Sequence, residues 1–196
     1  MPSLRSLFIL PLLVVASLVS AQESLTVDRV DFNTTRDDWT QMEIKLTCLG
    51  NPSPEARDNN YLEGVKLKVY LAYERDAAAA QYDYYMSEVE IVIMERGDSY
   101  NVYFYLPGLI VERDKLRAEP EFYYVEVTIG ETTLTPLKNS MSSSIKNLQI
   151  LESMKSKANA EGEANAGLLM PIYYAPAEVR GRTDDLPLLL RRDPKQ

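Results

Sequence analysis

The chain has 196 residues, a net charge of −8 and no histidine. An acidic chain is repelled by phosphate backbones, so nucleic acid is not an expected partner. The lack of histidine excludes a Ser-His-Asp triad and a Cys-His pair, and no glycine-rich phosphate-binding loop is present. We therefore expect a non-enzymatic protein with no cofactor. No metal site is assigned, and calcium stays open as a ligand of the loop carboxylates between residues 28 and 38.

Residues 1–21 have the pattern of a cleaved secretory signal peptide. Arg5 is followed by an apolar run over residues 7–19, and small residues end the segment at Ala21. The run is shorter than the roughly 20 apolar residues of a membrane-spanning helix. We expect cleavage after Ala21, a secreted or periplasmic location, and no membrane-spanning segment in the mature chain. Cys48 is the only cysteine, so no intramolecular disulfide forms, and the thiol is expected to be buried.

Residues 22–136 are predicted to form a β-sandwich domain. Apolar and polar side chains alternate most clearly over residues 42–48 and 65–73, which is typical of half-buried strands. Further strands are expected over residues 25–33, 84–94, 100–106 and 122–129, with a weak edge strand near 132–135. Residues 75–81 and 109–119 break the alternation and are expected to be loops. The pattern predicts an all-β, antiparallel sandwich of about six or seven strands, similar to immunoglobulin and fibronectin domains.

The composition changes after Pro136. Residues 137–157 are predicted to be a linker with a short amphipathic helix, because apolar side chains recur every three residues from Ile145 to Met154 behind a run of serines. Residues 158–167 have no apolar anchor. We expect residues 158–196 to be a flexible, largely disordered tail that carries two apolar clusters.

Tyrosine is the most unusual part of the composition, with 13 tyrosines against 4 phenylalanines. Tyrosine suits protein interfaces and sugar stacking, but cross-strand tyrosines also simply cover a half-exposed sheet. Both interpretations stay open. The candidate binding residues come from the tyrosine-rich strands and from the tail. They are Tyr84, Tyr103, Tyr105, Tyr124, Ile172, Tyr173, Tyr174, Leu188, Leu189 and Leu190.

Paired carboxylates leave one enzymatic chemistry open, because a glycoside hydrolase needs only two acids. Glu88 and Glu90 share a strand face, and Asp83 and Glu95 flank that strand. Such pairs also arise on any solvated strand surface. The sequence predicts an exported binding or assembly subunit of the cell envelope, whose partner is another envelope protein or a second copy bound through the tail. The alternative is a carbohydrate-binding or carbohydrate-cleaving domain.

Overall fold

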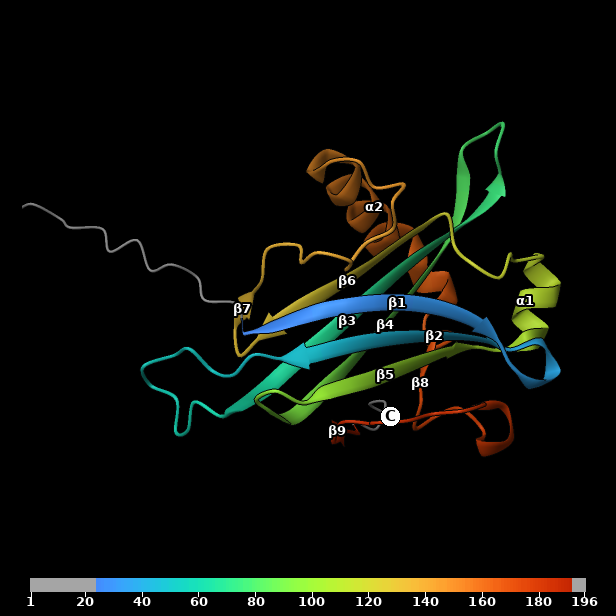
Figure 1. Cartoon of the computed structure of the whole chain (residues 1–196). Helices are drawn as coiled ribbons and strands as arrows, with labels where there is room; N and C mark the ends of the chain where they lie inside the picture. The colour runs from blue at the N-terminus through green and yellow to red at the C-terminus, as the bar shows by residue number, and fades with distance from the viewer. Residues whose placement is uncertain (1–23, 192–196) are drawn as a thin grey trace, which may run out of the picture.

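The computed structural model describes residues 24–191, so the signal-peptide prediction lies outside the described residues. Two antiparallel sheets pack face to face (Figure 1). The first sheet, sheet A, consists of β1 (Leu25–Thr34), β2 (Thr40–Cys48), β5 (Ser99–Leu106) and β8 (Met170–Pro171), in that order. The second, sheet B, has the order β7 (Thr132–Thr133), β6 (Phe122–Ile129), β3 (Tyr61–Asp76), β4 (Gln81–Glu95) and β9 (Leu189–Leu190). The predicted all-β sandwich is confirmed.

The strand order is that of an immunoglobulin-like sandwich. In such folds the first, second and fifth strands are neighbours in one sheet. In the second sheet the third strand lies next to the sixth, and in some variants a fourth strand is added on the other side of the third. The same neighbours occur here, because β1, β2 and β5 are adjacent in sheet A and β6, β3 and β4 are adjacent in sheet B. The antiparallel register joins β2 to β5 over eight residue pairs from Thr40 to Thr47.

The core lies between the two sheets and follows from the alternation along the strands. Ile44, Leu67 and Phe104 are fully buried there, while the residues between them on each strand point outward. Cys48 is also buried, and burial raises the pKa of its thiol, which keeps it protonated and unreactive.

One end of the sandwich is closed by a short helix where the sequence suggested a loop. This helix, α1 (Gly108–Asp114), directly follows β5. Its start meets the turn after β1, η1 (Arg36–Asp38), so closely that a Cβ on Gly108 would lie 1.9 Å from the carbonyl oxygen of Asp37. Only glycine permits this contact. The other predicted loop, residues 75–81, is the end of the long β3–β4 hairpin, with its turn at residues 77–80.

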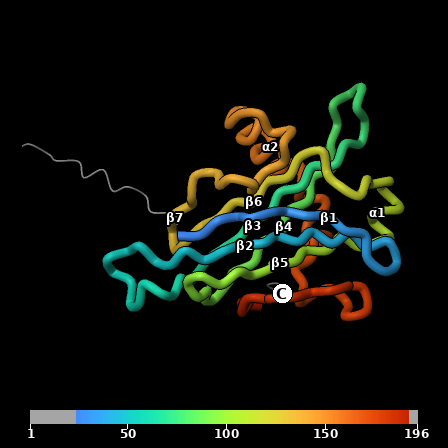
Figure 2. The backbone as a smooth tube through the Cα atoms, in the orientation of Figure 1, coloured from blue at the N-terminus to red at the C-terminus, as the bar shows by residue number. Residues whose placement is uncertain are grey.

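The chain after Pro136 is ordered up to residue 191, unlike the flexible tail that the sequence suggested. Helix α2 (Leu148–Glu161) begins at Asn147, whose side chain accepts a hydrogen bond of 2.9 Å from the Ile150 N–H. A single 3-10 turn, η2 (Gly162–Asn165), leads into β8, and another, η3 (Ala177–Val179), lies between β8 and β9. We call residues 168–191 the C-terminal segment. Figure 2 shows it in red beside β5, with α2 on the other side of the molecule.

The C-terminal segment adds a strand to the same side of both sheets. Strand β8 pairs with β5 at the edge of sheet A, and β9 pairs with β4 at the edge of sheet B. Composition alone misses this order, because the apolar side chains of the tail are stabilised by sheet surfaces that are distant in sequence. Within residues 24–191, no helix combines the length and apolar character needed to span a membrane.

Candidate binding surfaces

The tyrosines on the outer face of sheet B lie under α2. Tyr84 and Tyr124 are 5% and 2% exposed, and they pack with Leu151 and Met154 of the helix. Burial, helped by the nearby carboxylate of Glu126, raises the pKa of Tyr124 to about 12. These two candidate residues are therefore part of an internal contact between the sheet and its covering helix.

The tyrosines on the outer face of sheet A are covered by the C-terminal segment. The Tyr105 hydroxyl donates a hydrogen bond of 2.9 Å to the Arg180 carbonyl oxygen and accepts one of 3.0 Å from Gln41 Nε2. The Tyr103 hydroxyl accepts a hydrogen bond of 3.2 Å from the Asp184 N–H. Burial raises the pKa of both tyrosines. The rings point outward as the alternation predicts, but the surface they form binds the protein's own chain.

The candidates in the tail divide into buried and exposed residues. Ile172 is buried against Tyr103 and Tyr105, and its N–H donates to the Tyr103 carbonyl oxygen at 3.1 Å. Tyr173 and Tyr174 are half-buried, and their ring centroids are 4.7 Å apart. The remaining candidates, Leu188, Leu189 and Leu190, lie at the β9 edge of sheet B.

An exposed apolar surface lies along β9. Residues 186–190 alternate between exposed leucines and the more buried Pro187 and Leu189, so Leu186, Leu188 and Leu190 project to one side. Val92 joins them from β4, since its N–H donates to the Leu188 carbonyl oxygen at 2.9 Å. We call Val92, Leu186, Leu188 and Leu190 the β9 edge patch. Eight large apolar side chains are exposed in residues 24–191, and four of them form this patch.

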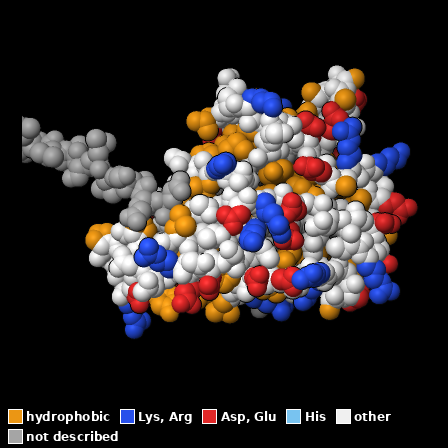
Figure 3. All heavy atoms as spheres, viewed as in Figure 1, with side chains coloured by type: hydrophobic (Ala, Val, Ile, Leu, Met, Phe, Trp, Pro, Cys, Tyr) orange, Lys and Arg blue, Asp and Glu red, His pale blue; other side chains and the backbone are white. Residues whose placement is uncertain are grey.

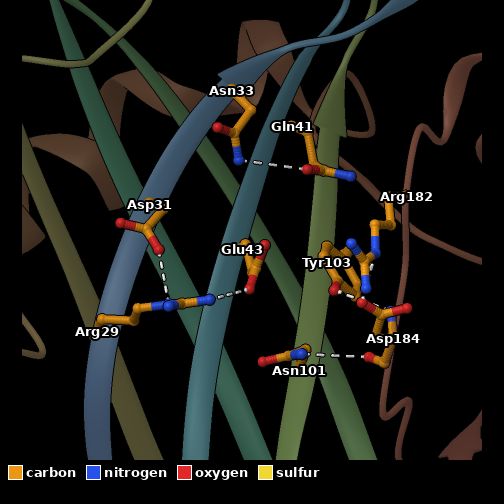
Figure 4. A network of polar contacts seen from close by, with 9 residues as sticks. All are labelled: Arg29, Asp31, Asn33, Gln41, Glu43, Asn101, Tyr103, Arg182 and Asp184. Atoms are coloured by element: carbon orange, nitrogen blue, oxygen red, sulfur yellow. Dashed lines mark hydrogen bonds and ion pairs between the residues drawn. The ribbon is translucent and has the colours of Figure 1, made fainter.

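A polar groove of about 610 Å³ lies on the outer face of sheet A, between β1 and residues 181–185 of the C-terminal segment. The groove lies over three cross-strand rows, each with one residue from β1, β2 and β5, and every residue of these rows except Asp31 and Tyr105 lines it. The rows are Arg29, Lys45 and Asn101; Asp31, Glu43 and Tyr103; and Asn33, Gln41 and Tyr105. Figure 4 shows seven of these side chains, with Arg182 and Asp184 of the C-terminal segment beside β5.

The charges in the groove are largely paired with one another. Arg29 contacts both Glu43 and Asp31 at 2.8 Å, and Arg182 contacts Asp184 at 2.8 Å. The hydrogen bond that Arg29 donates to Glu43, together with the negative charge of Asp31, raises the pKa of Arg29. Figure 3 shows the same mixture on the face it presents, where acidic and basic side chains are interspersed and neither forms a large area. The floor is therefore strongly polar but close to neutral.

One side chain in the groove, that of Asn101, has a buried polar atom with no hydrogen-bond partner among the described residues. The side chain is 8% exposed, and its Nδ2 donates a hydrogen bond of 3.3 Å to the Asp184 carbonyl oxygen. Its Oδ1 is buried and accepts no hydrogen bond from residues 24–191. In Figure 4 this oxygen lies on the side of the amide away from Asp184, towards β2.

The polar groove and Val92 were missed from the sequence. The alternation of side chains along the strands contains a signal for each. The outward positions of β1 and β2 are uniformly polar, and Val92 is an apolar residue at an outward position of β4. What the alternation does not show is that residues 181–190 lie next to both sites.

The paired acids proposed from the sequence lie on an ordinary strand surface. The register places Glu88 opposite Lys68 and Glu90 opposite Lys66, and Arg75 forms an ion pair with Asp83. In residues 24–191, no group of three or more His, Cys, Asp or Glu side chains is placed to hold a metal ion.

Comparison with known proteins adds information on the fold. No protein-family model matches the sequence, and no curated protein matches it. The chain is similar to a protein from Akkermansia muciniphila whose crystal structure is known, with a TM-score of 0.59, 16% sequence identity, and coverage of 86% of this chain and 93% of that one. At this identity the likeness concerns the fold alone. The similarity covers 86% of this chain, which is more than residues 1–136 make up. It therefore includes part of the chain after residue 136.

Proposed function

We propose that this protein is an exported, non-enzymatic binding or assembly subunit of the cell envelope that contacts another protein through the β9 edge patch. The signal-peptide pattern of residues 1–21 supports export. The β9 edge patch is the observation that carries the proposal, because contiguous exposed apolar side chains on a protein surface mark interaction sites.

The buried tyrosines do not contribute to this contact directly. Tyr103 and Tyr105 hold the C-terminal segment, and the segment in turn presents Leu186, Leu188 and Leu190 to solvent. The tail then acts as a fixed part of the binding surface and not as a free arm.

The contact is made by side chains more than by strand addition. Strand β9 has only two residues and follows Pro187, which has no N–H to donate, so the edge offers little backbone for another strand. Three leucines and a valine supply an apolar centre, and burial of each large apolar side chain stabilises a complex. The proposed partner is another envelope protein or a second copy of this chain.

Site-specific photocrosslinking in the native host tests the proposal. A benzoylphenylalanine at position 188 is expected to give a crosslinked product of defined mass, because Leu188 is 62% exposed within the patch. The same group at position 109 is the matched control, since Leu109 is 80% exposed on α1 and is not part of the patch.

The product at position 188 is expected to disappear when Leu186→Glu places a charge in the apolar contact. Identical products from positions 188 and 109, or a product at 188 that survives Leu186→Glu, would contradict a specific interface. No product at position 188 would also count against it.

A further inference from the structure

We propose that the polar groove on the outer face of sheet A is a binding site for a neutral, hydroxyl-rich ligand of the carbohydrate class. The groove shares no residue with the β9 edge patch, so this site does not depend on the protein contact proposed above. Three features of the groove carry the inference: an unpartnered buried acceptor, a neutral floor and a side chain that is free to move.

The Asn101 side chain marks the position of the ligand. Its Oδ1 is buried with no hydrogen-bond donor among residues 24–191, although Nδ2 is held by the Asp184 carbonyl oxygen. Buried polar atoms in folded proteins nearly always have a partner, so an acceptor left open at a groove is a place where a ligand donor fits. The backbone of Asn101 is fixed as well, since its N–H donates to the Asp185 carbonyl oxygen at 2.9 Å.

The charge balance of the groove selects a neutral ligand. The residues that line the groove, together with Asp31 beside Arg29, include four basic side chains (Arg29, Arg36, Lys45 and Arg182) and four acidic ones (Asp31, Glu43, Asp184 and Asp185), so their net charge is zero. An anion would meet the carboxylates and the Asn101 Oδ1 acceptor, and a cation would meet the guanidinium groups and the Lys45 ammonium. Hydroxyl groups both donate and accept, so a polyhydroxylated ligand can use the carboxylate, amide and guanidinium groups without breaking the pairs.

Lys45 is the neighbour of Asn101 in the groove. The register places Lys45 directly opposite Asn101 on the neighbouring strand. No hydrogen bond or ion pair joins the Lys45 ammonium to another residue in the range 24–191, so its long side chain can change rotamer without loss of a polar contact. A ligand hydroxyl that approaches the Asn101 Oδ1 beside Lys45 therefore displaces no hydrogen bond or ion pair of Lys45.

The site binds its ligand by hydrogen bonds and not by ring stacking. Tyr103 and Tyr105 are 2% and 0% exposed, so neither offers a ring face to a sugar. Recognition therefore depends on Asn101, Glu43 and the polar side chains around them, and affinity is expected to be weak.

Nuclear magnetic resonance titration suits such a weak site. We suggest residues 22–196, labelled with ¹⁵N, and three neutral oligosaccharides as probes: cellohexaose, maltohexaose and fully N-acetylated chitohexaose. At least one is expected to shift the amide signals of Lys45, Asn101 and Arg182 in a saturable manner. Asn101→Leu removes the acceptor and should weaken that binding roughly fivefold to tenfold, the effect of one lost hydrogen bond.

Two further variants keep the test independent of folding defects. Lys45→Ala shortens the side chain next to Asn101, leaves the acceptor in place, and should leave binding intact or tighten it. Asn159→Leu makes the same substitution as Asn101→Leu on the exposed surface of α2, away from the groove, and should leave binding unchanged.

Three results would overturn the proposal. One is the absence of saturable shifts with all three probes. Another is that shifts centre on the aromatic pocket beside α2, lined by Tyr82 and Phe122, and not on the groove. The third is that Asn101→Leu, with the fold confirmed by its own spectrum, binds as tightly as the unchanged chain.

Discussion

The outer faces of the two sheets are both rich in tyrosine, and both are covered by the chain that follows residue 136, but the two covers differ in chemistry. On sheet B the cover is α2, which contacts Tyr84 and Tyr124 through Leu151 and Met154. On sheet A the cover is an extended segment held largely by hydrogen bonds, such as those of Tyr105 and Gln41 to the Arg180 carbonyl oxygen at 2.9 and 2.7 Å.

The difference explains where binding surfaces remain. An amphipathic helix buries one apolar stripe over the strands beneath it. An extended segment is narrower, so residues 184 and 185 contact β5 and leave the polar groove open over β1 and β2. The same segment continues to β9 and exposes the β9 edge patch. Both proposed sites are therefore consequences of the extended cover.

The strongest test of the apolar cover is Leu151→Ala. Leu151 is 1% exposed between α2 and sheet B, so truncation is expected to lower the free energy of unfolding by about 2–5 kcal/mol. The control is Leu148→Ala on the same helix, which is 64% exposed and should change stability by less than about 0.5 kcal/mol. Denaturant titration measures both, and equal effects would mean that α2 does not pack through this face.

A smaller effect is expected from Tyr105→Phe in the polar cover. The change removes the hydroxyl that bridges Gln41 and the Arg180 carbonyl oxygen and should cost about 1 kcal/mol, because Gln41 still donates to the same carbonyl. Hydrogen exchange should quicken over residues 172–185 and stay unchanged in α2. Tyr61→Phe, at a tyrosine that is 37% exposed, is the control and should alter neither. Faster exchange in α2 would show that the two covers are coupled.

The smallest change in the free energy of unfolding at neutral pH is expected from Tyr124→Phe. Its effect on stability is expected at alkaline pH. The pKa of Tyr124 is raised to about 12 in the folded protein, against roughly 10 in an unfolded chain. Between these values the unfolded state loses its proton first, so stability is full below pH of about 10 and falls as the pH rises towards 12. Tyr124→Phe should reduce this alkaline loss in denaturant titrations across that window. An unchanged loss would mean that Tyr124 ionises equally in both states.

Much of the sandwich was predictable from local patterns. The alternation over residues 42–48 and 65–73 placed Ile44, Leu67 and their neighbours in the core, because a strand that is half-buried must turn every second side chain inward. The same rule put Tyr103 and Tyr105 on the outer face. It could not tell whether that face meets water, a partner or the protein's own chain.

The order of the tail was not predictable in this way. Residues 158–167 have no apolar anchor when taken alone, yet residues 158–161 complete α2 and Asn165 donates a hydrogen bond of 3.0 Å to the Tyr84 carbonyl oxygen. Leu188 and Leu190 were identified as candidates because they are apolar. Their exposure beside Val92 depends on pairing between β4 and β9, which are almost 100 residues apart in the chain.

By itself the sequence determined the sandwich class, the main strands, the buried cysteine and the acidic, histidine-free chemistry, because period-two alternation and composition are local properties. Only the tertiary structure decided which tyrosines are covered, that residues 168–191 add strands to both sheets, and where the polar groove and the β9 edge patch lie. Those features arise from contacts between distant segments, and their stability comes from complementary surfaces that no single stretch of sequence contains.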